Sequence, residues 1–182
     1  CFSYCAAVSG AEPPQRIASY SPGATQTLLD LGSSAQIIAT TRWCPLPKTH
    51  PAVRTCDAFN PDLETLLQAK PDLVILPRLA NPLWAERYTR AGLKIIILQT
   101  EGPDSVARDL ELLGEATHQQ VAAKALRARL DRPAASGPRT LLIVWDGMMA
   151  GPDAYTTPVL KQAGFKSPLQ AGTWVKLDWE LL

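Results

Sequence analysis

Aromatic and basic side chains follow several apolar runs of this chain. Arg42 and Trp43 come directly after one such run, and Arg78 follows another. Aromatic rings offer a large rigid contact area at low entropic cost, and guanidinium groups pair with carboxylates or stack on π faces. Such a set can contact a ligand that has apolar surface and anionic groups. The predicted ligand-binding residues are Ser21, Pro22, Arg42, Trp43, Phe59, Arg78, Trp145, Tyr155 and Trp174.

Several of these side chains also have a purely structural interpretation. Trp145 ends an apolar run and fits a core position equally well, while Phe59 could cover the domain below it. Arg78 could be a solvated loop charge. Trp43 is the strongest single candidate, because a tryptophan in a proline-rich loop has little other reason to be there. Ser21 and Pro22 open a predicted helix, whose first backbone N–H groups can bind anions.

The residue types argue against catalysis and against a metal-ion receptor. The chain contains neither of the two nucleotide-binding glycine patterns, GxGxxG and GxxxxGK(S/T), and it has no GxSxG nucleophile turn. Its two histidines, His50 and His118, are too few for a zinc or manganese site and lie near no candidate nucleophile. We therefore predict no catalytic residue, no metal ligand and no intrinsic cofactor. An α/β enzyme of unknown type and a zinc or manganese receptor remain as alternatives.

Composition excludes other classes of protein. The chain has 182 residues, of which 46% are hydrophobic, so it can form a real core and is not mainly disordered. Its net charge of +1 argues against a nucleic-acid binder, which needs a basic field. It holds no apolar run long enough to span a membrane.

The first residues suggest secretion. Residues 1–11 are small and apolar without charge, and Ser9-Gly10-Ala11 has the form of a signal-peptidase site. We interpret 1–11 as a signal-peptide remnant, the alternative being a frayed terminus of a cytosolic protein. In an oxidising compartment Cys44 and Cys56 could form a disulfide or remain free thiols, and the sequence leaves both possibilities open.

Strands and helices alternate along the first hundred residues, and the strands are continuous apolar runs. Such runs are typical of parallel strands that helices cover on both faces, so an α/β fold is predicted. A long helical stretch follows at 103–131, with a break expected near Gly114 and Thr117. The predicted strands are 16–20, 36–41, 71–76, 93–98 and 139–145, and the predicted helices besides the long stretch are 22–31, 61–70, 82–91 and 154–163. Loops are predicted at 44–61 and after Gly164, where Trp174 lies.

The order and spacing of several motifs resemble those of a known family. The motifs are RIASYSPGAT at 16–25, IATTRWCPLP at 38–47, NPDLE at 60–64, KPDLVI at 70–75 and LLG at 112–114. The chain resembles periplasmic substrate-binding proteins whose two lobes are joined by one long helix. These proteins serve ABC importers of cobalamin, iron–siderophores and haem.

The resemblance implies two α/β lobes with ligand in the cleft between them. It assigns 12–102 to a parallel-sheet N-terminal lobe, 103–133 to the interlobe linker helix and 134–182 to a partial C-terminal α/β lobe. A complete member would need about 60–90 further residues to finish that lobe, so the chain resembles a member truncated at its C-terminus.

The resemblance also implies a partner. One acidic residue in each lobe, here Glu64 and Asp178, would dock onto arginines of the permease in the inner membrane. Ordinary first-turn carboxylates that stabilise a helix are the alternative, and Asp178 has a shorter reach than the usual glutamate. The implied function is capture of a cobalt or iron chelate, cobalamin or a ferric siderophore, by a periplasmic monomer that does not bind nucleic acid.

Overall fold

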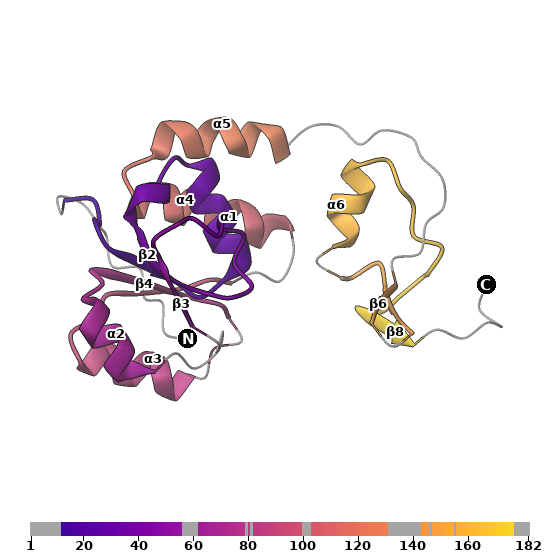
Figure 1. Cartoon of the computed structure of the whole chain (residues 1–182). Coiled ribbons are helices and arrows are strands. Elements are labelled where there is room, and N and C mark those ends of the chain that lie inside the picture. The colour runs from indigo at the N-terminus through magenta and orange to yellow at the C-terminus, as the bar shows by residue number, and fades with distance from the viewer. Residues whose placement is uncertain are drawn as a thin grey trace. The chain divides into compact units, whose positions relative to one another are not determined.

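The computed structural model divides the chain into two units, which we describe separately (Figure 1). The first comprises Cys1–Gln99 with Asp109–Leu126, and the second comprises Thr100–Arg108 with Arg127–Leu182. The residues that the structure describes are 12–55, 62–78, 80, 82–99, 103–130, 143–145, 147–154 and 156–176.

A parallel five-stranded sheet is the framework of the first unit. Its strand order is β3 (Val53–Thr55), β2 (Ile37–Thr41), β1 (Ile17–Ser19), β4 (Leu73–Leu76) and β5 (Ile95–Ile97). Every residue of β1 and β4 is buried, as expected for central strands that are covered on both faces. The predicted parallel α/β fold is therefore confirmed, although β3 lies in a segment that the sequence had suggested was only a loop.

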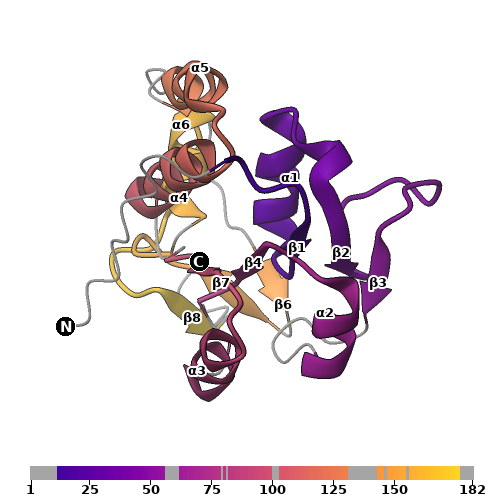
Figure 2. The same ribbon diagram turned by 90° about the vertical axis from the view of Figure 1, so that its left-hand side faces the viewer.

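Helices cover both faces of this sheet (Figure 2). On one face, Ala18 and Val74 pack in a single cluster with Leu66 of α2 (Leu63–Ala69) and Tyr88 of α3 (Pro82–Arg90). On the other face lie α1 (Pro22–Asp30) and the later part of α4 (Pro103–Ala116), as both views show. Alternate residues of each strand therefore contact different helices.

The two ends of α2 are secured by polar contacts. At its start, the Asp62 carboxylate accepts hydrogen bonds from the backbone N–H and the hydroxyl of Thr65, at 2.8 and 2.9 Å. At its end, the Arg16 guanidinium donates to the carbonyl oxygens of Ala69 and Lys70, at 2.6 and 2.9 Å. Because Arg16 directly precedes β1, this contact ties α2 to the central strand.

The connection from β2 to β3 contains no helix in the structure. It runs through residues 42–52 and is held by side chains at both ends. The Arg54 guanidinium of β3 donates to the carbonyl oxygens of Leu46 and Pro47, at 2.7 and 2.8 Å. The His50 ring lies 3.1 Å from the Ser34 carbonyl oxygen, next to a 3₁₀ turn at Ser34–Gln36.

The long helical stretch is two helices, α4 and α5 (Gln120–Leu130), with the predicted break between them. His118 has a φ of 57° at this corner, a left-handed conformation that ends the first helix. Gly114 of α4 lies against Ala123 of α5, and a Cβ added at Gly114 would lie 2.4 Å from the Ala123 Cβ. The two helices can therefore approach closely only because Gly114 has no side chain.

The second unit contains a three-stranded antiparallel sheet. Its strands are β6 (Ile143–Trp145), β7 (Met148–Ala150) and β8 (Trp174–Lys176), and its one described helix is α6 (Thr157–Gln162). The predicted strand at 139–145 and helix at 154–163 correspond to β6 and α6. The sequence did not suggest β7, and it placed β8 in a loop. In the part of the chain described here, no helix is long and apolar enough to cross a membrane.

Gly114→Ala should destabilise the protein, because the new methyl group overlaps the Ala123 side chain. We expect a loss of about 1–3 kcal/mol in the free energy of unfolding, measured by urea denaturation of the intact protein. Gly23→Ala in α1 is the matched control, since the nearest atom to its added Cβ is 3.9 Å away. That control should be neutral or stabilising, and equal losses in both variants would contradict the close contact.

Candidate functional site

The predicted binding residues of the first unit follow the carboxyl ends of its strands. Ser21 follows β1, Arg42 and Trp43 follow β2, and Arg78 follows β4. The strand order reverses between β1 and β4, because β2 and β3 lie on one side of β1 whereas β4 and β5 lie on the other. Ligands of open α/β sheets bind outside the carboxyl ends of the strands at such a point. Ser21 and Arg78 therefore flank that point.

Trp43 is directed outward from this edge of the sheet. Its side chain is 64% exposed, although tryptophan is among the most costly side chains to leave in water. The Arg42 guanidinium carbon lies 4.7 Å from the centroid of its rings, in a cation–π contact. The backbone N–H of Trp43 donates to the Thr41 hydroxyl at 3.2 Å. The Arg42 guanidinium thus covers part of the Trp43 indole, and the remaining surface of the indole is exposed.

A buried network of hydroxyl groups lies beneath these loops. The Ser19 and Thr25 hydroxyls are 2.9 Å apart, and the Thr25 hydroxyl donates to the Ser21 carbonyl oxygen at 3.0 Å. The Cys44 thiol lies 3.3 Å from the Thr41 hydroxyl and 3.7 Å from the Ser19 carbonyl oxygen. The network therefore links the loop after β1 to the loop that carries Trp43.

No motif in the sequence predicted this network. Its one visible signal was the presence of hydroxyl residues inside apolar runs, Ser19 and Thr41 among them, where a buried polar side chain needs a partner. Cys44, for which a disulfide was one possibility, is a buried free thiol in the structure. Cys56 lies outside the described residues.

Other predicted site residues fall elsewhere. Phe59, Tyr155 and Asp178 lie outside the residues that the structure describes. Trp145 is the last residue of β6, and only its backbone is described. Trp174 is half-buried at the start of β8, where it pairs with Ala150. Both tryptophans thus belong to strands of the second unit, whereas a loop position had been predicted for Trp174.

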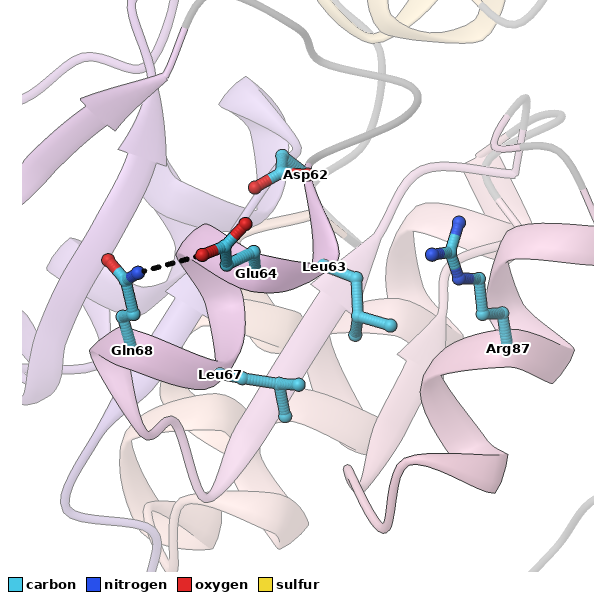
Figure 3. A pocket seen from close by; sticks show the side chains of 6 residues that line it. All are labelled: Asp62, Leu63, Glu64, Leu67, Gln68 and Arg87. Atoms are coloured by element: carbon cyan, nitrogen blue, oxygen red, sulfur yellow. Dashed lines mark hydrogen bonds between the residues drawn. The ribbon is translucent and has the colours of Figure 1, made fainter.

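Glu64 lines a hollow of about 520 Å³ on the first unit (Figure 3). The hollow lies between α2 and α3, and Arg87 of α3 forms its far side. The Glu64 carboxylate accepts a hydrogen bond of 3.4 Å from Gln68, one turn further along the exposed face of α2. The residues that line the hollow are Asp62, Leu63, Glu64, Leu67, Gln68 and Arg87.

Asp62 is the carboxylate of this hollow whose charge is most strongly stabilised. The hydrogen bond from the Thr65 backbone N–H lowers its pKa, and the Thr65 hydroxyl and the positive charge of Arg87 act in the same direction. Because the pKa of Asp62 is lowered in the folded state, its ionised carboxylate stabilises the fold fully at neutral pH. This stabilisation is lost as the pH falls through the lowered pKa. Asp62 is therefore engaged in capping the N-terminus of α2, whereas among the described residues the Glu64 carboxylate accepts a hydrogen bond only from Gln68 and is the more available to a partner.

Among the described residues, no group of three or more His, Cys, Asp or Glu side chains could hold a metal ion.

Thr25→Val should weaken the first unit, because it removes the hydroxyl that joins Ser19 to the Ser21 carbonyl. We expect the free energy of unfolding to fall by about 1–3 kcal/mol, since buried polar groups lose their partner. Thr27→Val in the same helix is the control, because its hydroxyl only bonds back to the Gly23 carbonyl. A loss of similar size in the control would show that the buried network contributes nothing special.

Comparison with known proteins gives consistent results. The periplasmic binding protein family matches residues 17–182. A cobalamin-binding protein of Halobacterium salinarum is 24% identical over 166 residues, covering 83% of this chain and 45% of that protein. A vitamin B12-binding protein of Pectobacterium carotovorum is 31% identical over 122 residues, covering 65% of this chain and 43% of that protein. The chain thus spans less than half the length of these curated relatives.

Solved structures show the same fold. The periplasmic heme-binding protein HutB of Vibrio cholerae matches with a TM-score of 0.78 at 18% identity, covering 92% of this chain and 71% of that one. The periplasmic vitamin B12-binding protein BtuF of Vibrio cholerae matches with a TM-score of 0.68 at 20% identity, covering 93% and 72%. Because the model of that family matches residues 17–182, which is most of the chain, the chain belongs to the periplasmic binding protein family.

Proposed function

We propose that this protein captures a chelated-metal ligand in the periplasm and delivers it to the permease of an ABC importer. Cobalamin is the first candidate ligand, because the relatives with 24% and 31% sequence identity are named cobalamin-binding and vitamin B12-binding proteins. A ferric siderophore is the second candidate, because Arg42 and Arg78 follow strands at the same edge of the sheet and suit an anionic ligand. Membership in a family of binding proteins supports this function over an enzymatic one.

The exposed Arg42–Trp43 pair is the observation that carries the proposal. A half-exposed indole costs hydration free energy in the unliganded protein, and covering it with a flat ligand recovers that cost. The cation–π contact keeps the ring from rotating freely, so less entropy is lost when ligand binds. The cobalt or iron ion is cargo inside its chelate, and the contacts are made to the organic part of the ligand.

Delivery requires a contact with the permease, for which Glu64 is the candidate in the first unit. Glu64 is exposed, and in the described part of the chain its carboxylate accepts one hydrogen bond, from the Gln68 side chain. An exposed carboxylate can pair with an arginine of the permease and speed docking. Asp178 is proposed for the equivalent contact in the second unit. We propose that the protein acts as a monomer, so that one Glu64 and one Asp178 are presented to each permease.

Trp43→Ala should lower ligand affinity without unfolding the protein, because the side chain packs against little else. We expect at least about a tenfold rise in Kd for aquocobalamin, as for the loss of an aromatic anchor. The measurement is titration of the intact protein followed by absorbance, repeated with a ferric siderophore and with hemin. Trp84→Phe is the control, since Trp84 packs on Tyr88 with ring centroids 5.9 Å apart. Unchanged affinity for every ligand would remove Trp43 from the site.

Glu64→Gln should weaken binding to the permease and leave ligand affinity intact. The substitution keeps the shape and removes the charge, so a fall in the association rate is expected first. Binding to the importer complex in nanodiscs and ligand titration are measured side by side. Glu86→Gln on α3 is the control, because that carboxylate already pairs with Arg90. An equal fall in ligand affinity would place Glu64 in the ligand site or in the fold.

A further inference from the structure

The hollow between α2 and α3 has charges of opposite sign on its two sides (Figure 3). Glu64 and Gln68 lie on the α2 side, and Arg87 projects from α3 on the other. Leu63 and Leu67 lie between them, and the Leu67 side chain is 44% exposed. Protein contacts commonly bury apolar side chains at the centre and keep polar side chains at the rim, and the leucines and flanking charges of this hollow have that arrangement.

Within the described ranges, Arg87 contacts an aromatic ring and has no ionic partner. Its guanidinium carbon lies 4.9 Å from the ring centroid of Trp84, one turn earlier in α3. Trp84 itself packs against Tyr88, which is fully buried in the core. Among the described residues the one ion pair of α3 joins Arg90 to Glu86, and no carboxylate pairs with Arg87. The donors of its guanidinium are therefore pre-positioned and available.

The charge of Arg87 still reaches the acidic side of the hollow. It contributes to lowering the pKa of Asp62, although the two groups form no ion pair. In the view of Figure 3, the Leu63 side chain lies between Asp62 and Arg87. The acidic side of the hollow and Arg87 are therefore held apart, and a partner that binds between them can form an ion pair with each.

We propose that Arg87 is a second anchor of the permease contact and pairs with an acidic side chain of the permease, while Glu64 pairs with a basic one. An apolar permease side chain would lie over Leu63 and Leu67 between these two pairs. This inference rests on the proposed function, and it adds a contact of reversed polarity. Two opposite pairs fix the orientation of a docked surface, which a single carboxylate cannot do.

The test compares Arg87→Gln with Arg90→Gln in the intact protein. Both residues lie on the exposed side of α3, and only Arg90 already has an ionic partner. Affinity for the importer complex in nanodiscs should fall about tenfold for Arg87→Gln and change less than about twofold for Arg90→Gln. Arg87→Glu should fall further, Arg87→Lys should retain most of the affinity, and ligand affinity should stay unchanged in all variants.

The outcomes separate this inference from the proposed function. If Glu64→Gln weakens permease binding and Arg87→Gln does not, the second anchor is wrong and the docking role of Glu64 stands. If both variants bind the permease normally, the docking face itself is wrong. A loss of ligand affinity in Arg87→Gln would also overturn the inference, because the hollow would then belong to the ligand site. Replacing an acidic permease residue by arginine should restore binding of Arg87→Glu.

Discussion

The parallel pairing of β1 with β2 on one side and β4 on the other is the interaction on which the first unit depends. A strand buried on both edges and both faces must have its backbone groups paired by its neighbours, since no water reaches them. All its loops then leave the sheet at one of two ends. Ser21, Trp43 and Arg78, which the proposal places at the ligand, follow strands at one end for this reason, although they lie far apart in the sequence.

The buried hydroxyl network gives these loops a common base. Ser19 and Thr41 belong to neighbouring strands, and the Cys44 thiol contacts both residues. Each of these polar groups is costly to bury alone and has a partner here, so the loops resist moving independently. A ligand that meets Trp43 therefore contacts a surface whose position is already set, which lowers the entropy lost on binding.

Much of this arrangement could be predicted from the residues, for identifiable reasons. The runs of apolar residues at 71–76 and 36–41 indicated buried strands because both of their faces contact helices. The positions of Trp43 and Arg78 followed from where those runs end, and the position of Ser21 followed from the end of the run at 16–20. β3 and β8 could not be found in the same way. Both are short strands whose pairing depends on residues distant in the chain, and β8 contains the tryptophan that had been placed in a loop.

The network and the hollow were beyond prediction for a different reason. The contact of Cys44 with Ser19 depends on how two loops fold back over the sheet, which no local pattern encodes. Arg87 had no special signal, because an exposed arginine on a helix is ordinary. Arg87 became a candidate only when the structure showed its contact with Trp84 and its place across the hollow from Glu64.

The connection between β2 and β3 has an evolutionary consequence. Residues 42–52 carry Trp43 and also set the place of β3, because Arg54 bonds back to the Leu46 and Pro47 carbonyls. An insertion here would therefore displace an edge strand together with Trp43. Any change in the length of this loop has to preserve the Arg54 contacts if β3 is to keep its place, which restricts how the loop that carries Trp43 can vary.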